Sequence, residues 1–299
     1  YIHRTPVLTN QSLNDVACAQ VFLKCENLQK VGAFKFRGAC NAVFSLSDEA
    51  AECGVATHSS GNHAQALALA ARVRGIPAHI VMPENAPSVK KVAVAAYGGQ
   101  ITFCEPTLEA RESTLAQVVE KTGASVVHPY NDVRVIAGQG TAAIELLEDI
   151  PDLDVILAPV GGGGLLSGTA IAATETRPGI RVIAGEPEMA DDAYRSMREG
   201  KIVPSVKPTT IADGLLTSLG TLTFPVIQQR VEQIVPVSEQ GIIEAMRFIW
   251  ERAKIVIEPS AAVAVGVLWE KKIDLTGLKV GVILSGGNVD LEKLPWNSR

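Results

Sequence analysis

Short apolar runs rich in β-branched residues alternate along this chain with longer stretches in which apolar residues recur at helical spacing. Between residues 55 and 128 the pattern predicts four strands and three helices. The strands are expected at 55–58, 79–82, 100–104 and 125–128, and the helices from about residue 62 and at 88–97 and 108–121. Strands separated by helices of about 10–15 residues are typical of a parallel sheet with right-handed crossovers. We therefore predict a small α/β lobe in this part of the chain.

The same alternation continues on both sides of this lobe. Further strands are expected at 21–25, 155–160, 181–185, 234–237 and 279–284, and helices at 38–46, 137–149, from 165 onward, and at 190–198, 223–230, 239–254 and 260–271. The pattern predicts an α/β fold of two lobes, in which twisted sheets made mainly of parallel strands are flanked by helices. We assign residues 1–50 and 131–299 to a large lobe and residues 51–130 to a smaller, mobile lobe that closes over a ligand.

Composition narrows the class of protein. The chain has 299 residues, of which 47% are hydrophobic and 20% charged, and its net charge is -5. An acidic balance without a basic cluster argues against nucleic-acid binding, and no apolar run approaches the ~20 residues that a membrane span needs. The five cysteines form no C-x-x-C pair, which is typical of a reducing compartment, and the five histidines lack zinc-site spacing. We expect a cytoplasmic protein, or one from which an organelle leader has been removed.

Four consecutive glycines, Gly161 to Gly164, separate the apolar strand 155–160 from a helix. Backbone without Cβ atoms lets several N–H groups point into one small space, and the positive end of the helix adds to them. Such a turn binds phosphate. It lacks the lysine of a Walker A loop, and the third glycine of a dinucleotide fingerprint is replaced by Leu166 or Ser167. A small phosphorylated cofactor fits better than a nucleotide, and a tight turn without a ligand is the alternative.

Lys35 lies between two phenylalanines and two glycines, in a stretch from 30 to 37 that we expect to be a loop. Burial beside aromatic rings lowers the pKa of a lysine and supplies the free amine that a Schiff base needs. A surface lysine whose stem covers apolar neighbours has the same sequence signature. This heptapeptide alone does not separate the two interpretations.

Two further strand ends carry hydroxyl groups and glycines. Residues 57–64 (THSSGNHA) lead into a helix whose N-terminus could hold a carboxylate, although Ser59, Ser60 and Asn62 are also ordinary N-cap residues. Residues 285–290 (SGGNVD) follow the last strand. Because ligands of open parallel sheets bind beyond the carboxyl ends of the strands, we expect the turns at 57–64, 161–164 and 285–288 to face one crevice.

An acidic turn follows the strand at 181–185. Glu186 and Asp192 lie on either side of it, and paired carboxylates with a backbone carbonyl can bind Mg²⁺ or Ca²⁺. A solvated acidic helix start is the alternative, and the spacing alone favours it.

A lysine, a phosphate turn and a carboxylate-binding turn together suit pyridoxal phosphate and an amino acid. At this point the chain resembles the fold-type II pyridoxal-phosphate enzymes of the serine/threonine dehydratase family, which have the tryptophan synthase β-like fold, and most closely their racemase-type members. The resemblance covers nearly the whole chain. It rests on GAFKFRGA at 32–39, SSGNH at 59–63, AGQGT at 137–141, GGGG at 161–164, EP then ADD at 186–192, TIADG at 210–214 and LSGGNVD at 284–290.

The resemblance implies roles for single residues. Lys35 is the Schiff-base lysine, Ser60 is the acid/base on the opposite face of the substrate, and Ser285 faces the pyridine nitrogen. The remaining cofactor residues are Phe34 beside the ring, Asn62 at the ring's 3-oxygen, and Gly161, Gly162, Gly163, Gly164 and the N–H of Leu165 around the phosphate. The substrate residues are Ser59, Ser60, Gly61, Asn62, His63 and Asp213, and the metal ligands are Glu186, the carbonyl of Ala190 and Asp192.

The resemblance also implies a function. We expect an enzyme that interconverts L- and D-serine and eliminates water from L-serine to give the 2-oxo acid and ammonia, with L-threonine and threo-3-hydroxyaspartate as further candidate substrates of the elimination. A dedicated threonine or threo-3-hydroxyaspartate dehydratase is the alternative; a β-replacement enzyme such as cysteine synthase, or a catalytically silent relative, fits less well. A homodimer is expected. ATP is a possible effector at Gln65, Lys90 and Tyr97, although Tyr130 stands where mammalian racemases carry asparagine.

Overall fold

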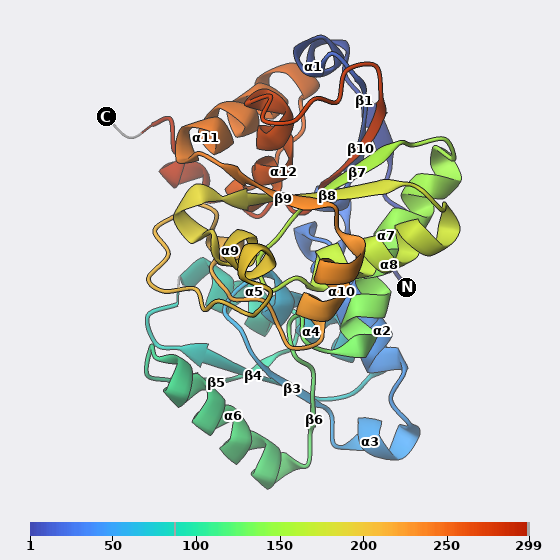
Figure 1. Cartoon of the computed structure of the whole chain (residues 1–299). Coiled ribbons are helices and arrows are strands. Elements are labelled where there is room, and N and C mark those ends of the chain that lie inside the picture. The colour runs from blue at the N-terminus through green and yellow to red at the C-terminus, as the bar shows by residue number, and fades with distance from the viewer. Residues whose placement is uncertain (87, 298–299) are drawn as a thin grey trace. The chain divides into compact units, whose positions relative to one another are not determined.

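The structure is a computed structural model that describes residues 1–86 and 88–297 (Figure 1). Contacts divide these residues into two units. Unit 1 comprises Tyr1–Ile2 and Lys35–Gly138, and unit 2 comprises His3–Phe34 and the chain from Gln139 onward. The chain therefore passes between the units at 2/3, at 34/35 and at 138/139. We predict that residues 51–130 form a mobile lobe that closes over a ligand. One structure does not show such a movement, so this stays a prediction.

Unit 2 contains a six-stranded sheet with the order β1-β2-β10-β7-β8-β9. All neighbouring strands are parallel except β1, which is antiparallel to β2. The strands are β1 (Val7–Thr9), β2 (Gln20–Cys25), β7 (Val155–Pro159), β8 (Arg181–Pro187), β9 (Gln233–Val237) and β10 (Lys279–Leu284). The helices are α1 (Gln11–Ala17), the second half of α7 (Val133–Asp149), α8 (Gly164–Thr176), α9 (Asp192–Glu199), α10 (Thr223–Arg230), α11 (Glu239–Phe248) and α12 (Pro259–Trp269).

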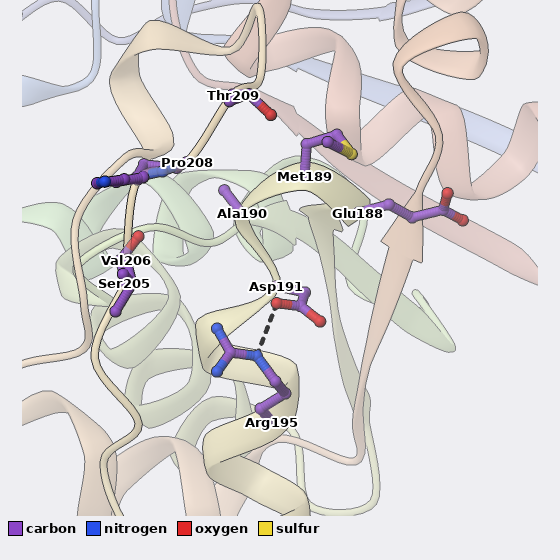
Figure 2. Close-up of a pocket in the computed structure, with 10 residues that line it drawn as sticks. Glu188, Met189, Ala190, Asp191, Arg195, Ser205, Val206, Pro208 and Thr209 are labelled. Carbon is purple, nitrogen blue, oxygen red and sulfur yellow. Dashed lines mark hydrogen bonds and ion pairs between the residues drawn. The ribbon is translucent and has the colours of Figure 1, made fainter.

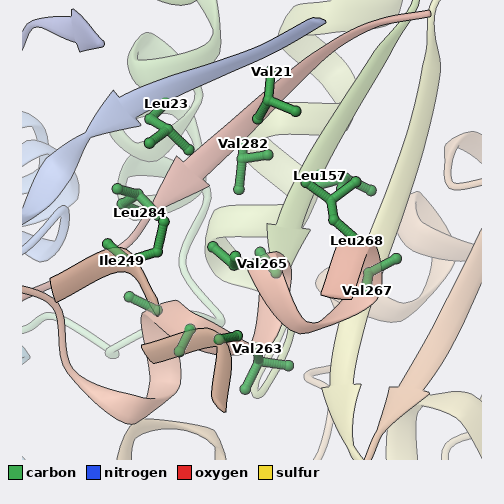
Figure 3. Packing of buried hydrophobic residues seen from close by; sticks show 14 of the residues in the cluster. Val21, Leu23, Leu157, Ile249, Val263, Val265, Val267, Leu268, Val282 and Leu284 are labelled. Carbon is green, nitrogen blue, oxygen red and sulfur yellow. The ribbon is translucent and has the colours of Figure 1, made fainter. Parts of the chain in front are cut away.

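Helices cover both faces of this sheet, because successive strand residues point to opposite sides and both sides are apolar. Leu157 and Val282 belong to one core cluster, which Figure 3 shows with residues of α12, whereas their neighbours Ile156 and Ile283 belong to the cluster around α8. The helix α12 is apolar on all sides and nine of its residues, Ser260 to Leu268, are buried.

Unit 1 contains a four-stranded, fully parallel sheet with the order β5-β4-β3-β6. The strands are β3 (Val55–His58), β4 (Ala78–Pro83), β5 (Gln100–Cys104) and β6 (Ser125–Val126), and the helices are α2 (Lys35–Phe44), α3 (Asp48–Glu52), α4 (Asn62–Arg74), α5 (Ser88–Ala96), α6 (Leu108–Thr122) and the first half of α7. This confirms the predicted alternation of strands and helices. None of the described helices in either unit is long and apolar enough to cross a lipid bilayer.

The structure corrects three expectations about local structure. Lys35 does not lie in a loop, because α2 begins at this residue. The helix predicted to run to residue 254 ends as an α-helix at Phe248 and continues as a π-helical turn, Ile249–Ala253. The short elements β1, α1 and α3 were not predicted.

Packing explains the early start of α2. Glycine lowers helix propensity, but Gly38 of α2 lies against Gly138 of α7, where an added Cβ would be 2.7 Å from the Cα of Gly38. Close helix contact therefore requires glycine at this place, and burial of Phe36, Ala39 and Cys40 outweighs the propensity.

Candidate active site

The glycine loop of unit 2 connects β7 to the N-terminus of α8. Gly163 is the N-cap of α8 with φ +87°, and no described side chain caps this helix. The hydroxyl of Thr223 donates to the carbonyl of Gly162 at 2.8 Å. Leu215 lies close to Gly161, since an added Cβ there would be 3.0 Å from its Cα. Contacts with Thr223 and Leu215 thus fix the loop, and the positive N-terminal end of the 13-residue helix α8 is suited to bind an anion.

Other predicted site residues of unit 2 lie at the same edge of the sheet. β10 is the parallel neighbour of β7, so Ser285, the residue after β10, emerges beside the glycine loop. Ser285 is buried, and its carbonyl accepts the N–H of Phe34 at 3.0 Å. Phe34 packs against the core cluster that includes Leu165. Asp213 begins the 3-10 turn Asp213–Leu215, whose last residue contacts Gly161.

Unit 1 brings Lys35 next to the segment that follows β6. The amine of Lys35 donates to the carbonyl of Pro129 at 2.8 Å. This carbonyl belongs to a turn in which Nδ1 of His128 accepts the N–H of Asn131 at 2.9 Å. Nε2 of His63 lies 3.1 Å from the carbonyl of Val127. The strand expected at 125–128 ends at Val126. The sequence singles out only Tyr130 of the turn at 127–131, and it does not predict the contact of this turn with Lys35.

The turn at 59–62 lies at the same edge of the unit 1 sheet, because β3 and β6 are parallel neighbours. The N–H of Ser59 donates to the carbonyl of Val81 at 3.1 Å, and its hydroxyl accepts the N–H of Gly61 at 3.4 Å. Gly61 is the N-cap of α4, and no described side chain caps this 13-residue helix. Ser60 and Asn62 are half-buried here. The N-terminus of α4 is therefore suited to a carboxylate.

The histidines of unit 1 are neutral hydrogen-bonding groups. Burial, together with the nearby charge of Lys35, lowers the pKa of His63 to about 3. Burial also lowers the pKa of His128 to about 4, with a contribution from His58, whose ring lies edge-on at 6.3 Å. At neutral pH neither the His63 ring nor the His128 ring carries a charge, so both act as neutral hydrogen-bonding groups beside Lys35.

The acidic turn after β8 is buried and not solvated, contrary to the interpretation that its spacing favoured. Glu186 is 1% exposed, and its two oxygens accept the N–H groups of Ala193 at 2.8 Å and Tyr194 at 2.7 Å. Asp192 is equally buried, and its Oδ2 has no hydrogen-bond partner among the described residues. Burial raises the pKa of Glu186 to about 9 and that of Asp192 to about 6.

These features fit a hard cation, which would compensate two buried carboxylates and use the open Asp192 oxygen. Within 1–86 and 88–297, no three His, Cys, Asp or Glu side chains are arranged so that they could hold a metal ion together, so backbone carbonyls such as that of Ala190, and water, would complete such a site. A cavity of about 200 Å³ borders on Ala190, and the ion pair of Asp191 and Arg195, at 2.7 Å, lines it (Figure 2).

The predicted site residues thus form two sets. Phe34, the glycine loop, Asp213 and Ser285 belong to unit 2, whereas Lys35 and the turn at 59–63 belong to unit 1. The chain itself joins the sets, because Phe34 and Lys35 are consecutive residues. Their predicted roles stay predictions.

The matching family model is that of the pyridoxal-phosphate dependent enzymes, and it covers residues 1–286. The chain belongs to this family. It is 53% identical over 297 residues to the beta-hydroxyaspartate dehydratase of Paracoccus denitrificans (strain Pd 1222), a match that covers 99% of this chain and 94% of the relative. It is 52% identical over 300 residues to the serine racemase of Dictyostelium discoideum, with 98% and 92% covered.

The solved structure of maize serine racemase is similar over 100% of this chain and 92% of its own, with a TM-score of 0.96 and 46% identity. These matches confirm the predicted family and the predicted fold-type II α/β architecture.

Proposed function

We propose that this chain is a serine racemase and amino-acid ammonia-lyase, which interconverts L- and D-serine and converts L-serine to pyruvate and ammonia. The observation that carries the proposal is the uncapped glycine loop at the start of α8, with Ser285 at the same sheet edge. The relatives named serine racemase and beta-hydroxyaspartate dehydratase support both halves of it.

The cofactor of the family fits the residues of unit 2. The glycine loop and the N–H of Leu165 would bind the phosphate, Phe34 would pack on the ring, and Ser285 would meet the ring nitrogen. Ser285 offers a neutral hydroxyl to the ring nitrogen. A carboxylate at the same place would instead keep that nitrogen protonated. Bound pyridoxal phosphate makes the Cα proton of an amino acid acidic by accepting the electron pair left behind.

The proton transfers are assigned to unit 1. Lys35 carries the cofactor and removes the Cα proton of L-serine. In racemisation, Ser60 delivers a proton to the opposite face of Cα. In elimination, the Cβ–O bond breaks and the hydroxyl leaves as water with the proton that Lys35 removed from Cα; uptake of a second water then gives pyruvate and ammonia. The contact of Lys35 with the carbonyl of Pro129 supports this assignment, because it directs the amine toward the sheet edge that also carries Ser60.

The substrate carboxylate is assigned to the N-terminus of α4. Ser59, Gly61, Asn62 and His63 surround this helix end, and its aligned N–H groups favour an anion. Asp213, on the turn of unit 2 that contacts Gly161, is also assigned to the substrate.

A dedicated threonine or threo-3-hydroxyaspartate dehydratase is the second candidate, because the relative from Paracoccus is named for that reaction. A substrate with two carboxylates needs a further cation. Arg134 of unit 1 already forms an ion pair with Asp132 at 2.6 Å and donates to the carbonyl of Val126. We therefore place serine before hydroxyaspartate.

The metal and the nucleotide are separate parts of the proposal. Mg²⁺ or Ca²⁺ is assigned to Glu186, the carbonyl of Ala190 and Asp192, where it would stabilise unit 2 and take no part in the reaction. ATP is assigned to unit 1 as an effector, at Lys90 and Tyr97. The third predicted residue, Gln65, is only 8% exposed. Activity measured with and without ATP at constant Mg²⁺ tests the nucleotide.

We further propose a homodimer and a cytoplasmic location. Sedimentation analysis tests the first and fractionation of the source cells tests the second.

One reaction tests the main proposal. Purified protein is incubated with pyridoxal phosphate, Mg²⁺ and L-serine, and pyruvate and D-serine are measured together over time. Formation of both products supports the proposal. Pyruvate without D-serine, and faster turnover of hydroxyaspartate or threonine than of serine, would favour the dedicated dehydratase. Activity with O-acetylserine alone would favour β-replacement.

A further inference from the structure

Val31, four residues before Lys35, has a backbone conformation that valine rarely adopts. Its φ is 58° and its ψ is 14°, in the left-handed region, and its side chain is buried. The β-branched side chain makes this region especially unfavourable. Gly32 follows with φ 70°, so two consecutive residues are left-handed. Such strain persists only where surrounding contacts hold it, and it is concentrated at functional sites.

The side-chain amide of Asn288 holds both residues. Its Nδ2 donates to the carbonyl of Val31 at 2.7 Å. Its Oδ1 lies over Gly32, where an added Cβ would be 2.6 Å away. The N–H of Gly287 donates to the carbonyl of Gly32 at 2.9 Å. One amide group, on the loop that follows Ser285, therefore contacts both the strained Val31 and the left-handed Gly32.

Buried polar side chains of unit 2 accept hydrogen bonds from the backbone just before Val31 and from the backbone of Asn288. Oε1 of Gln29, which is 3% exposed, accepts the N–H of Lys30 at 3.0 Å and that of His3 at 2.9 Å. The carboxylate of Glu258, which is 5% exposed, accepts the N–H of Asn288 at 3.2 Å. All these partners belong to unit 2.

The residues that follow Val31 and Gly32 also contact the loop that begins at Ser285. Ala33 forms a β-bridge with Gly286, and the N–H of Phe34 donates to the carbonyl of Ser285. Lys35 is the next residue. The direction of the backbone that leads into Lys35 therefore depends on the conformation of Val31 and Gly32.

We propose that Asn288 and Val31 are positioning residues for Lys35: Asn288 holds Val31 in the left-handed conformation, and this conformation directs the lysine that carries the cofactor. The proposal rests on the function proposed above, which assigns the cofactor to Lys35. Loss of the Asn288 amide lets residue 31 return to an ordinary conformation and turns the chain that leads to Lys35. A displacement of about 1 Å at a reacting group costs about 100-fold in rate.

The test is the Asn288→Ala variant combined with two substitutions at residue 31. Glycine adopts the left-handed region without cost, whereas alanine keeps the Cβ that makes it unfavourable. The Val31→Gly and Val31→Ala variants therefore differ only in the group that causes the strain. Lys271→Gly is the matched control, because Lys271 is exposed, has φ 51° and lies elsewhere in unit 2.

Two readouts do not depend on turnover. One is the rate at which added pyridoxal phosphate forms a bond with Lys35, trapped by borohydride and located by peptide mapping. The other is hydrogen exchange at the Phe34 amide in the protein before the cofactor is added. For Asn288→Ala we expect bond formation to be at least about ten times slower, exchange at Phe34 to be faster, and kcat to fall more than KM rises. Val31→Gly should restore the rate in the double variant, and Val31→Ala should not.

Equal rescue by Val31→Gly and Val31→Ala would overturn the proposal, and so would an Asn288→Ala variant with normal bond formation and normal exchange. If Asn288→Ala does not fold, Asn288→Asp removes the same donor at nearly constant volume, and the same slowing is expected. Wild-type protein that forms no trapped bond at Lys35 would refute the proposed function. The contribution of Asn288 to the Val31 conformation would then still be decided by exchange at Phe34, where unchanged exchange refutes it.

Discussion

Replacing Gly163 by alanine tests whether the glycine loop requires a residue without a Cβ at this position. At φ +87° an L-residue costs roughly 1–2 kcal/mol. The added methyl group would also lie 2.8 Å from Cδ1 of Ile227 and 2.8 Å from Oγ1 of Thr223, both inside contact distance. Overpacking of this kind costs about 1–3 kcal/mol. We therefore expect Gly163→Ala to lower the free energy of unfolding by about 2–5 kcal/mol.

Gly179→Ala is the matched control, because Gly179 has φ +88° and no atom within 4 Å of an added Cβ. It carries the same backbone cost without the overlap, so about 1–2 kcal/mol is expected. The entropy that each alanine removes from the unfolded chain is the same and cancels. The difference of about 1–3 kcal/mol corresponds to roughly 2–6 °C in Tm.

Binding of pyridoxal phosphate separates the two variants further. Thr223 donates to the carbonyl of Gly162, so moving Thr223 distorts the loop, and we expect Gly163→Ala to weaken cofactor affinity at least about tenfold, or about 1.4 kcal/mol. Gly179→Ala should bind as the wild type does. Urea unfolding and a fluorescence titration with the cofactor measure the two quantities. Equal destabilisation of both variants, or unchanged affinity in Gly163→Ala, would refute the reasoning.

Three further predictions follow from the other parts of the molecule. Ser60→Ala should abolish formation of D-serine while largely sparing pyruvate from L-serine, because only racemisation needs a proton from the second face; equal loss of both products would contradict the two-base assignment. Removal of divalent cations by EDTA should lower Tm and Mg²⁺ should restore it, because Asp192 and Glu186 are buried carboxylates, and Asp192→Asn should show no such response. The pKa of His63 is about 3 in the folded protein, below the usual 6.5, so the folded state excludes a proton that the unfolded chain binds below pH 6.5. The free energy of unfolding that His63 contributes is therefore present above pH 6.5 and is lost on acidification, by about 2 kcal/mol at pH 5. The urea midpoint of His63→Gln should depend less on pH between 7.5 and 5 than that of the wild type.

Most of the regular structure could be predicted from the sequence. The strands at 55–58, 100–104 and 279–284 have the predicted bounds, because runs of apolar, β-branched residues bounded by polar and glycine residues are local signals. The position of the glycine loop between its strand and its helix is also confirmed. Four residues without a Cβ between an apolar strand and a helical pattern favour a tight strand-to-helix turn.

Long-range packing overrides local sequence preference at several places in the fold. Lys35 begins a helix because Gly38 and Gly138 let α2 and α7 approach closely, and these residues are a hundred positions apart. Glu186 is a buried cap of α9, although its sequence neighbourhood is typical of a solvated turn. The strain at Val31 depends on Asn288, whose distance along the chain makes it invisible to any local pattern.

The alternation of elements, the family and the kinds of chemical groups available can be read from the sequence alone, because they depend on neighbouring residues and on motifs. The pairing of β7 with β10, which delivers the glycine loop and Ser285 to one sheet edge, and the pairing of β3 with β6, which does the same for Ser60 and the turn that contacts Lys35, required the fold. Strand order is set by which apolar faces can be buried together, and that is a property of the whole chain.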